Sequence, residues 1–383
     1  MVITFVVDIF TDMKNGTSMT AHRFVEALRR RGHEVRVLAI GEPGPDNYYV
    51  READYGFISK IGHNQGFSFA KFDETTVRRA LEGSDIVHFL LPMPFEIQVY
   101  HLAKKMGIPC SAAFHMQPEN ASYIIHIEKI AGINDAIYKL LYQMFYKHFR
   151  HIHCPSKFIA GELKKHQYDA KLYVISNGVD DAFRPMEVEK ATDPEKFNIL
   201  MTGRLSPEKR QEVLIEAVKR SKYRDKIQIY LAGAGSQMME GHLTKCGESL
   251  PNPPIIRFYS QADLIRLINS CDLYVHTATV EIEAIACLEA LTCGLVPVIC
   301  NSPKSATVQF ALDENSLFHA DDPTDLAGKI DYWIEHPEEK KALGKQYAKY
   351  GDGFRVSESV KKAEFMFRQA IADQRGKKPY DGR

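Results

Sequence analysis

Apolar positions in the first half of the chain alternate between short continuous runs and stretches with helical spacing. Residues 2–7 form an unbroken apolar run, typical of a strand buried on both faces of a parallel sheet. Residues 17–31 carry apolar side chains at helical spacing, and Gly32 ends this helix before a strand at 34–40. Further strands are predicted at 84–90, 109–114 and 151–155. This succession predicts a doubly wound parallel sheet.

The second half repeats this pattern. Its predicted strands lie near residues 197–202, 226–232, 254–258, 272–276 and 295–300. The sequence therefore predicts an α/β protein of two Rossmann-like domains, with a boundary in the turn-rich segment 175–185. We expect ligands at the carboxyl ends of the strands, where doubly wound sheets bind them.

Two glutamates mark the most informative motif, VEIEAIACLEALTCG. Glu281 lies at the predicted mouth of a helix and Glu289 lies on that helix. A helix mouth presents free backbone N–H groups that suit a phosphate, and neighbouring carboxylates accept hydrogen bonds from sugar hydroxyls. The pair therefore suits a nucleotide sugar. The alternative is that these residues only stabilise the helix through its dipole.

A loop with two cations follows the strand near 197–202, in the motif TGRLSPEK. Arg204 and Lys209 could clamp a diphosphate, or they could be solvated charges on a loop. Ser206 and Pro207 are expected to open the following helix. The same half carries a second glycine turn, LAGAG, which contains Gly233.

The chain resembles retaining glycosyltransferases of family 4, which have the two-domain GT-B fold. Six motifs carry this resemblance in order: NGTSMTAHRFVEALRRRGHEVRVL, FHMQPEN, VISNGVD, TGRLSPEK, LAGAG and EIEAIACLEALTCGLVPVI. The resemblance implies an acceptor-binding domain at 1–178 and a nucleotide-sugar-binding domain at 179–356. It also implies that a last helix, 357–373, returns to pack on the first domain.

The resemblance implies roles for individual residues. Gly16 would approach the donor diphosphate or the acceptor, and His115 would lie near the transferred sugar, although a tight turn and a structural histidine are the plain alternatives. The catalytic set would be His115, Glu281, Arg204 and Lys209. Donor contacts would come from Gly16, Arg204, Lys209, Gly233, Glu281 and Glu289, and acceptor contacts from Asn15, Thr17, Gln117, Glu119 and Asn120.

One segment departs from the family pattern. Ile282, Glu283 and Ala284 stand where many members have Gly-Phe-Gly, so they also belong to the expected donor site. Loss of two glycines restricts the approach of the backbone to a ligand, and Glu283 adds a negative charge near the expected diphosphate.

Composition narrows the class of protein. The 383 residues have a formal net charge of zero, which argues against a general nucleic-acid binder. The seven cysteines form no CxxC pair, as expected in a reducing compartment, and we expect neither a signal peptide nor a membrane span. The chain has no DxD motif at a strand end, so we expect metal-independent transfer without a cofactor.

Residues 131–151 combine aromatic and basic side chains at helical spacing. Such a helix could lie on an anionic membrane, with further lysines up to residue 165, or it could be a core helix with solvated lysines. Motif style favours transfer of glucose or galactose from UDP to diacylglycerol or ceramide, by a cytoplasmic protein on the inner face of the plasma membrane. The alternatives are a polysaccharide or lipid-linked oligosaccharide acceptor, a non-catalytic partner subunit, and a nucleotide-sugar epimerase.

Overall fold

The computed structural model describes residues 1–10, 16–42, 48–64, 67–124, 127 and 130–376. The chain divides into two compact units, each with its own parallel sheet. The first unit comprises Met1–Gly178 together with Val356–Arg383, and the second comprises Val179–Arg355. Asn15, one of the predicted acceptor contacts, lies outside the described residues.

The first unit contains a seven-stranded parallel sheet in the order β3-β2-β1-β6-β7-β8-β9. Its strands are β1 (Val2–Val6), β2 (Glu34–Ile40), β3 (Tyr48–Val50), β6 (Ile86–Phe89), β7 (Cys110–Ala113), β8 (His151–Cys154) and β9 (Lys171–Val174), with a separate antiparallel pair β4 (Glu52–Ala53) and β5 (Phe69–Ala70). Its helices are α1 (Gly16–Arg30), α2 (Phe57–Asn64), α3 (Glu74–Leu81), α4 (Pro94–Lys105), α5 (Pro118–Ile124), α6 (Ile133–Met144), α7 (Lys157–Lys165) and α14 (Val356–Gln374), with the 3-10 turn η1 (Tyr146–His148).

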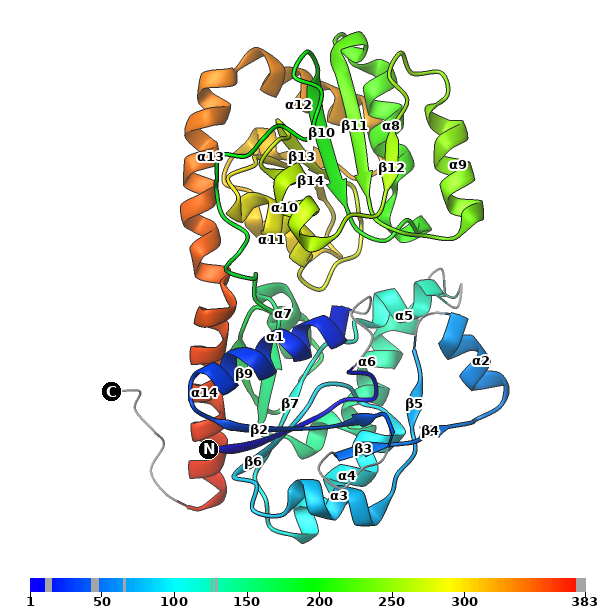
Figure 1. Cartoon of the computed structure of the whole chain (residues 1–383). Helices are drawn as coiled ribbons and strands as arrows, with labels where there is room; N and C mark the ends of the chain where they lie inside the picture. The colour runs from blue at the N-terminus through cyan, green and yellow to red at the C-terminus, as the bar shows by residue number, and fades with distance from the viewer. Residues whose placement is uncertain (11–15, 43–47, 65–66, 125–126, 128–129, 377–383) are drawn as a thin grey trace. The chain divides into compact units, whose positions relative to one another are not determined.

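The C-terminal helix α14 is an integral part of the first unit. It lies beside α1, and both helices contribute buried apolar side chains to one core with β1 and β2 (Figure 1). Glu364 accepts hydrogen bonds from the Arg31 guanidinium at 2.6 and 2.8 Å, and its Oε1 lies 2.7 Å from His33 Nε2. Near the other end of the helix, Asp373 accepts a hydrogen bond from Lys171 at 2.8 Å.

The second unit contains a six-stranded parallel sheet in the order β12-β11-β10-β13-β14-β15. Its strands are β10 (Phe197–Thr202), β11 (Ile227–Ala232), β12 (Ile255–Arg257), β13 (Leu273–His276), β14 (Pro297–Asn301) and β15 (Leu317–His319). Its helices are α8 (Gln211–Arg220), α9 (Gln237–Gly247), α10 (Gln261–Ile268), α11 (Ile285–Thr292), α12 (Pro323–Glu335) and α13 (Pro337–Gly351), and its 3-10 turns are η2 (Pro207–Lys209), η3 (Arg224–Lys226), η4 (Ala306–Phe310), η5 (Glu314–Ser316) and η6 (Asp352–Phe354).

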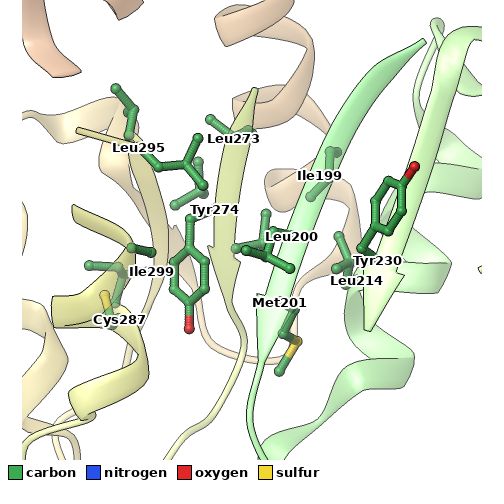
Figure 2. Packing of buried hydrophobic residues seen from close by; sticks show 14 of the residues in the cluster. Ile199, Leu200, Met201, Leu214, Tyr230, Leu273, Tyr274, Cys287, Leu295 and Ile299 are labelled. Carbon is green, nitrogen blue, oxygen red and sulfur yellow. The ribbon is translucent and has the colours of Figure 1, made fainter. Parts of the chain in front are cut away.

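The core of the second unit is apolar on both faces of its central strand. Leu200 on β10 pairs in register with Tyr230 on β11 and with Tyr274 on β13. Figure 2 shows that the two tyrosine rings point toward opposite ends of the sheet, with the Tyr274 hydroxyl toward the carboxyl ends of the strands. The Tyr274 hydroxyl therefore lies toward the end of the sheet at which doubly wound sheets bind their ligands.

The helix after β10 begins later than the sequence predicts. Ser206 and Pro207 open only the short 3-10 turn η2, because the Ser206 hydroxyl donates to the Glu208 carboxylate at 2.6 Å and caps no backbone N–H. Arg210 then adopts a left-handed conformation, with φ of 56°, and α8 begins at Gln211. This extra turn carries Lys209 away from the helix and toward the end of β13.

Candidate active site

Lys209, His276 and Glu281 form a buried cluster at the carboxyl end of the second sheet. β13 ends at His276, whose Nε2 lies 3.1 Å from Glu281 Oε1. The Lys209 ammonium contacts the same oxygen. The side chains of His276 and Glu281 are 1% and 9% exposed, so water screens these contacts little.

The cluster keeps Glu281 ionised. Burial alone would raise the pKa of Glu281, but the Lys209 charge and the His276 hydrogen bond outweigh burial and lower the pKa to about 2. Thr277 donates a hydrogen bond to the Lys209 carbonyl at 2.7 Å, and Ala306 N donates to the Glu281 carbonyl at 2.9 Å. Both backbones are therefore held in place, and the cluster presents a fixed carboxylate next to a cation.

Arg204 does not join this cluster. Its side chain is 60% exposed and makes an ion pair with Glu208 at 3.3 Å. The Arg204 carbonyl accepts a hydrogen bond from Gln211 at 2.7 Å, which ties the loop to the start of α8. The structure thus places one predicted cation in a buried ion pair and the other at the surface.

Gly233 has a structural reason to be glycine. A Cβ atom at this position would lie 1.8 Å from the Gly203 carbonyl oxygen, so no other residue fits without moving the backbone. The parallel pairing continues past β10 and β11, with Leu205 N donating to the Ala234 carbonyl at 2.9 Å. The two glycine turns are therefore packed on each other at the carboxyl end of the sheet.

The segment that replaces Gly-Phe-Gly keeps a backbone conformation that glycine adopts easily. Ala284 has φ of 63° and ψ of 69° and precedes the first residue of α11. Glu283 is 1% exposed, so its carboxylate points into the protein. Glu289 lies on α11 and is 8% exposed. The helix begins at Ile285, and Glu281 therefore precedes it by four residues.

The predicted residues of the first unit gather after β7. His115 and Gln117 follow this strand, and Glu119 and Asn120 lie in the first turn of α5. The His115 ring is 5.2 Å from the ring of His153, and burial, followed by the nearby His153, holds the pKa of His115 well below its usual value. His115 Nε2 is buried and has no hydrogen-bond partner among the described residues. His115 is therefore a neutral ring with an acceptor or donor nitrogen to spare.

Gly16 and Thr17 begin α1 after the first strand. Gly16 is the first residue of α1 and does not have a positive φ. A Cβ at Gly16 would meet no atom of the described residues within 4 Å. Packing against the described residues therefore does not require glycine at this position.

Two sequence models match this chain. The model of Glycosyltransferase Family 4 covers residues 14–183, and the model of glycosyl transferases group 1 covers residues 184–350. The chain belongs to the family 4 glycosyltransferases. The predicted family and the predicted GT-B fold class are thereby confirmed, with solved structures of similar fold along almost the whole chain.

Individual relatives of this glycosyltransferase differ in their substrates. The GDP-mannose-dependent alpha-mannosyltransferase of Corynebacterium glutamicum is 25% identical over 78% of this chain and 72% of its own length. The structure of Anabaena HepE with UDP and glucose is 16% identical, with a TM-score of 0.68 over 95% of this chain and 98% of that chain. The catalytic domain of the Helicobacter pylori cholesterol-alpha-glucosyltransferase is 44% identical over 41% of this chain and 99% of that chain, but its TM-score is only 0.38.

The aromatic residues that suggested a membrane helix belong to the core of the glycosyltransferase. Four residues of this segment are at most 8% exposed: Tyr138 and Leu141 on α6, and Phe145 and Phe149 on either side of η1. The opposite face of α6 carries exposed side chains. They are Asp135, Ala136, Lys139, Leu140, Gln143 and Met144, followed by the exposed Lys147. The interpretation of the buried residues as a membrane face was therefore wrong. Within α6, only the exposed face is available for contact with a membrane.

Sequence reasoning missed two residues of this site. His276 is a polar residue at the end of an otherwise apolar strand, and this pattern could have identified it as a candidate site residue. Phe258 follows β12 and is 66% exposed. The backbone carbonyl of the preceding residue, Arg257, accepts a hydrogen bond from Gly233 N at 2.9 Å, so the backbone just before Phe258 lies next to the second glycine turn.

The described part of the chain contains no group of three or more His, Cys, Asp or Glu side chains that could hold a metal ion. None of the described helices is both long and apolar enough to cross a lipid bilayer.

Proposed function

We propose that this glycosyltransferase moves glucose or galactose from UDP to a membrane lipid hydroxyl, such as that of diacylglycerol or ceramide, with retention of configuration. The observation that carries the proposal is the buried contact of Lys209 and His276 with Glu281 at the carboxyl end of the second sheet. This arrangement offers a cation to a diphosphate and an ionised carboxylate to sugar hydroxyls.

In this proposal the donor lies along the second sheet. Lys209 and the more exposed Arg204 neutralise the diphosphate, Glu281 accepts hydrogen bonds from the sugar, and Glu289 accepts them from the ribose. Among the described residues, Glu281 Oε2 accepts no hydrogen bond, since both Lys209 and His276 use Oε1. We propose that the exposed Phe258 ring stacks on the nucleobase, a contact worth about 1–3 kcal/mol.

The chemical step needs no covalent intermediate. The acceptor oxygen bonds to the anomeric carbon while the bond from that carbon to the diphosphate oxygen breaks. The acceptor proton passes to the departing diphosphate on the same face, which retains the configuration. Lys209 stabilises the charge that develops on the diphosphate, so the proposed transfer proceeds without a metal ion.

The acceptor is proposed to reach the first unit from a membrane. His115, whose Nε2 has no hydrogen-bond partner among the described residues, and the polar residues Glu119 and Asn120 would contact the sugar or the acceptor. Leu140 and Met144 on the exposed face of α6 would enter the interface of an anionic membrane beside lysines. The protein would then work on the inner face of the plasma membrane.

A second donor deserves equal testing because a curated relative uses it. The Corynebacterium glutamicum relative depends on GDP-mannose. UDP-glucose, UDP-galactose and GDP-mannose differ in base and in hydroxyl orientation, which a few hydrogen bonds distinguish. Calorimetric titration with each compound decides between them.

Variants of the central ion pair test the donor site. Lys209→Met should weaken binding of UDP or GDP roughly 10–100-fold, because it removes a charge-assisted contact. Glu281→Gln should leave the nucleotide bound at least as tightly, since Lys209 is no longer shared, but should weaken the nucleotide sugar. Lys219→Met is the matched control, because Lys219 pairs with Glu216 on α8. Equal affinities in Lys209→Met and wild type would contradict the assignment.

A further inference from the structure

Glu281 is the last member of a buried chain of hydrogen bonds that runs inward from the site. Thr202 Oγ1 lies 3.2 Å from the Tyr274 hydroxyl, and this hydroxyl lies 3.3 Å from His276 Nδ1. His276 Nε2 then lies 3.1 Å from Glu281 Oε1. This series of hydrogen bonds links the ends of β10 and β13 to the Glu281 carboxylate.

The members of this chain are shielded from water. Tyr274 is fully buried, His276 is 1% exposed and Thr202 is 5% exposed. Burial raises the pKa of Tyr274 well above its ordinary value, so its hydroxyl keeps its proton and can donate it. A buried network of this kind has a definite polarity, because each group has few other partners.

The Glu281 carboxylate determines which group donates and which accepts in each of these hydrogen bonds. Glu281 is ionised and can only accept, so His276 Nε2 must carry a proton. His276 Nδ1 is then satisfied if the Tyr274 hydroxyl donates to it, and Tyr274 is in turn satisfied by the Thr202 hydroxyl. The Lys209 ammonium contacts the same carboxylate oxygen, Glu281 Oε1.

We propose that His276 is a positioning residue, fixed as the Nε2–H tautomer by Thr202 and Tyr274, which holds Glu281 Oε1 so that Oε2 faces the donor sugar. This proposal rests on the proposed role of Glu281 as a sugar contact. Lys209 would share its charge between the diphosphate and Glu281, whereas the hydrogen bond from His276 would keep the carboxylate aligned. The fixed carboxylate then distinguishes sugar hydroxyls by their orientation.

The matched variants come from the same sheet. Tyr274→Phe removes the hydroxyl that sets the tautomer, whereas Tyr230→Phe removes the hydroxyl of the tyrosine at the same register on the other side of Leu200. Figure 2 shows that the Tyr230 hydroxyl points away from the carboxyl ends of the strands, so this variant is a control for the loss of a buried phenol. His276→Leu removes the imidazole, and His276→Gln restores an N–H donor near the position of Nε2.

The experiment measures two properties of each protein. Imidazole ¹⁵N shifts, assigned by comparison with His276→Gln, report the tautomer of His276. Calorimetry reports the dissociation constants of UDP, GDP, UDP-glucose, UDP-galactose and GDP-mannose. We expect an Nε2–H tautomer in the wild type. We also expect the bound nucleotide sugar to be weakened about 10–100-fold in His276→Leu and less in His276→Gln, with UDP or GDP affinity unchanged.

Several results would overturn the proposal. An Nδ1–H tautomer or an imidazolium in the wild type would do so. Equal affinities for the nucleotide sugar in Tyr274→Phe and Tyr230→Phe would do so as well, and so would a loss of bare UDP or GDP binding in His276→Leu, which would show a general structural role. If the wild type bound none of the nucleotide sugars, the proposed function would fail, and the ¹⁵N shifts would still decide for or against the fixed tautomer.

Discussion

Single residues of this protein carry strain and unusual protonation, and both leave measurable effects. Ala284 holds a left-handed conformation that costs a non-glycine residue energy. The three histidines His88, His115 and His153 lie together in the first unit, and burial lowers the pKa of each. At this scale the sequence shows which residues are present, whereas their backbone angles and neighbours come only from the fold.

Ala284→Gly should stabilise the second unit. Glycine removes about 1–2 kcal/mol of left-handed strain and loses about 0.5–1 kcal/mol through the greater freedom of the unfolded chain, so a net gain of about 0.5–1 kcal/mol is expected. Urea unfolding measures this gain. Ala290→Gly, in the interior of α11, is the control and should be destabilising. A loss of stability in Ala284→Gly would show that the alanine methyl contributes more than the strain costs.

His153 should make the protein less stable in mild acid. Burial lowers the pKa of His153 from 6.5 to about 4, against a smaller opposing effect of its hydrogen bond to the Ile175 carbonyl. The unfolded chain therefore takes up the proton first, and stability present above pH 6.5 is lost as pH falls toward and through 4. Between pH 7.5 and 4.5, His153→Gln should lose about 2–3 kcal/mol less unfolding free energy than the wild type. Equal losses would mean that His153 is accessible to protons in the folded protein.

The spacing of apolar residues predicted some strands and helices of this protein correctly and missed others. The strands predicted at 34–40 and 197–202 match β2 and β10. The edge strand β9 was not predicted, because its residues are only partly buried and mix polar with apolar side chains. In α6 apolar residues occur on both faces, so helical spacing alone could not decide which face is buried.

The exposed face of α6 provides the test at this scale. Replacing Leu140 and Met144 together with aspartate should reduce binding to anionic vesicles about tenfold or more, because two half-exposed apolar side chains no longer enter the interface. Binding should also weaken with added salt. Met238→Asp changes a methionine that is 83% exposed in the second unit and serves as the control. Unchanged vesicle binding in the double variant would remove α6 from the membrane proposal.

For the whole molecule, the sequence could predict two successive sheets and the main polar residues that follow their strands. It could not predict that Lys209 and His276 meet at one oxygen of Glu281, because this depends on the extra turn η2 and on the loop between β13 and α11. It also could not reveal that Gly233 is required by packing against Gly203. Local signals specify elements, whereas contacts between loops require the assembled sheet.

The central claim is that the second unit presents a nucleotide sugar for transfer to a membrane lipid. Its most direct test is mass spectrometry of lipids after incubation with UDP-glucose, UDP-galactose or GDP-mannose and anionic vesicles that contain diacylglycerol or ceramide, in the presence of EDTA. The account predicts an α-linked hexosyl lipid from a UDP-hexose, and none from Glu281→Gln at comparable enzyme concentration. A glycosylated soluble acceptor with no glycolipid, or transfer that stops in EDTA, would contradict it.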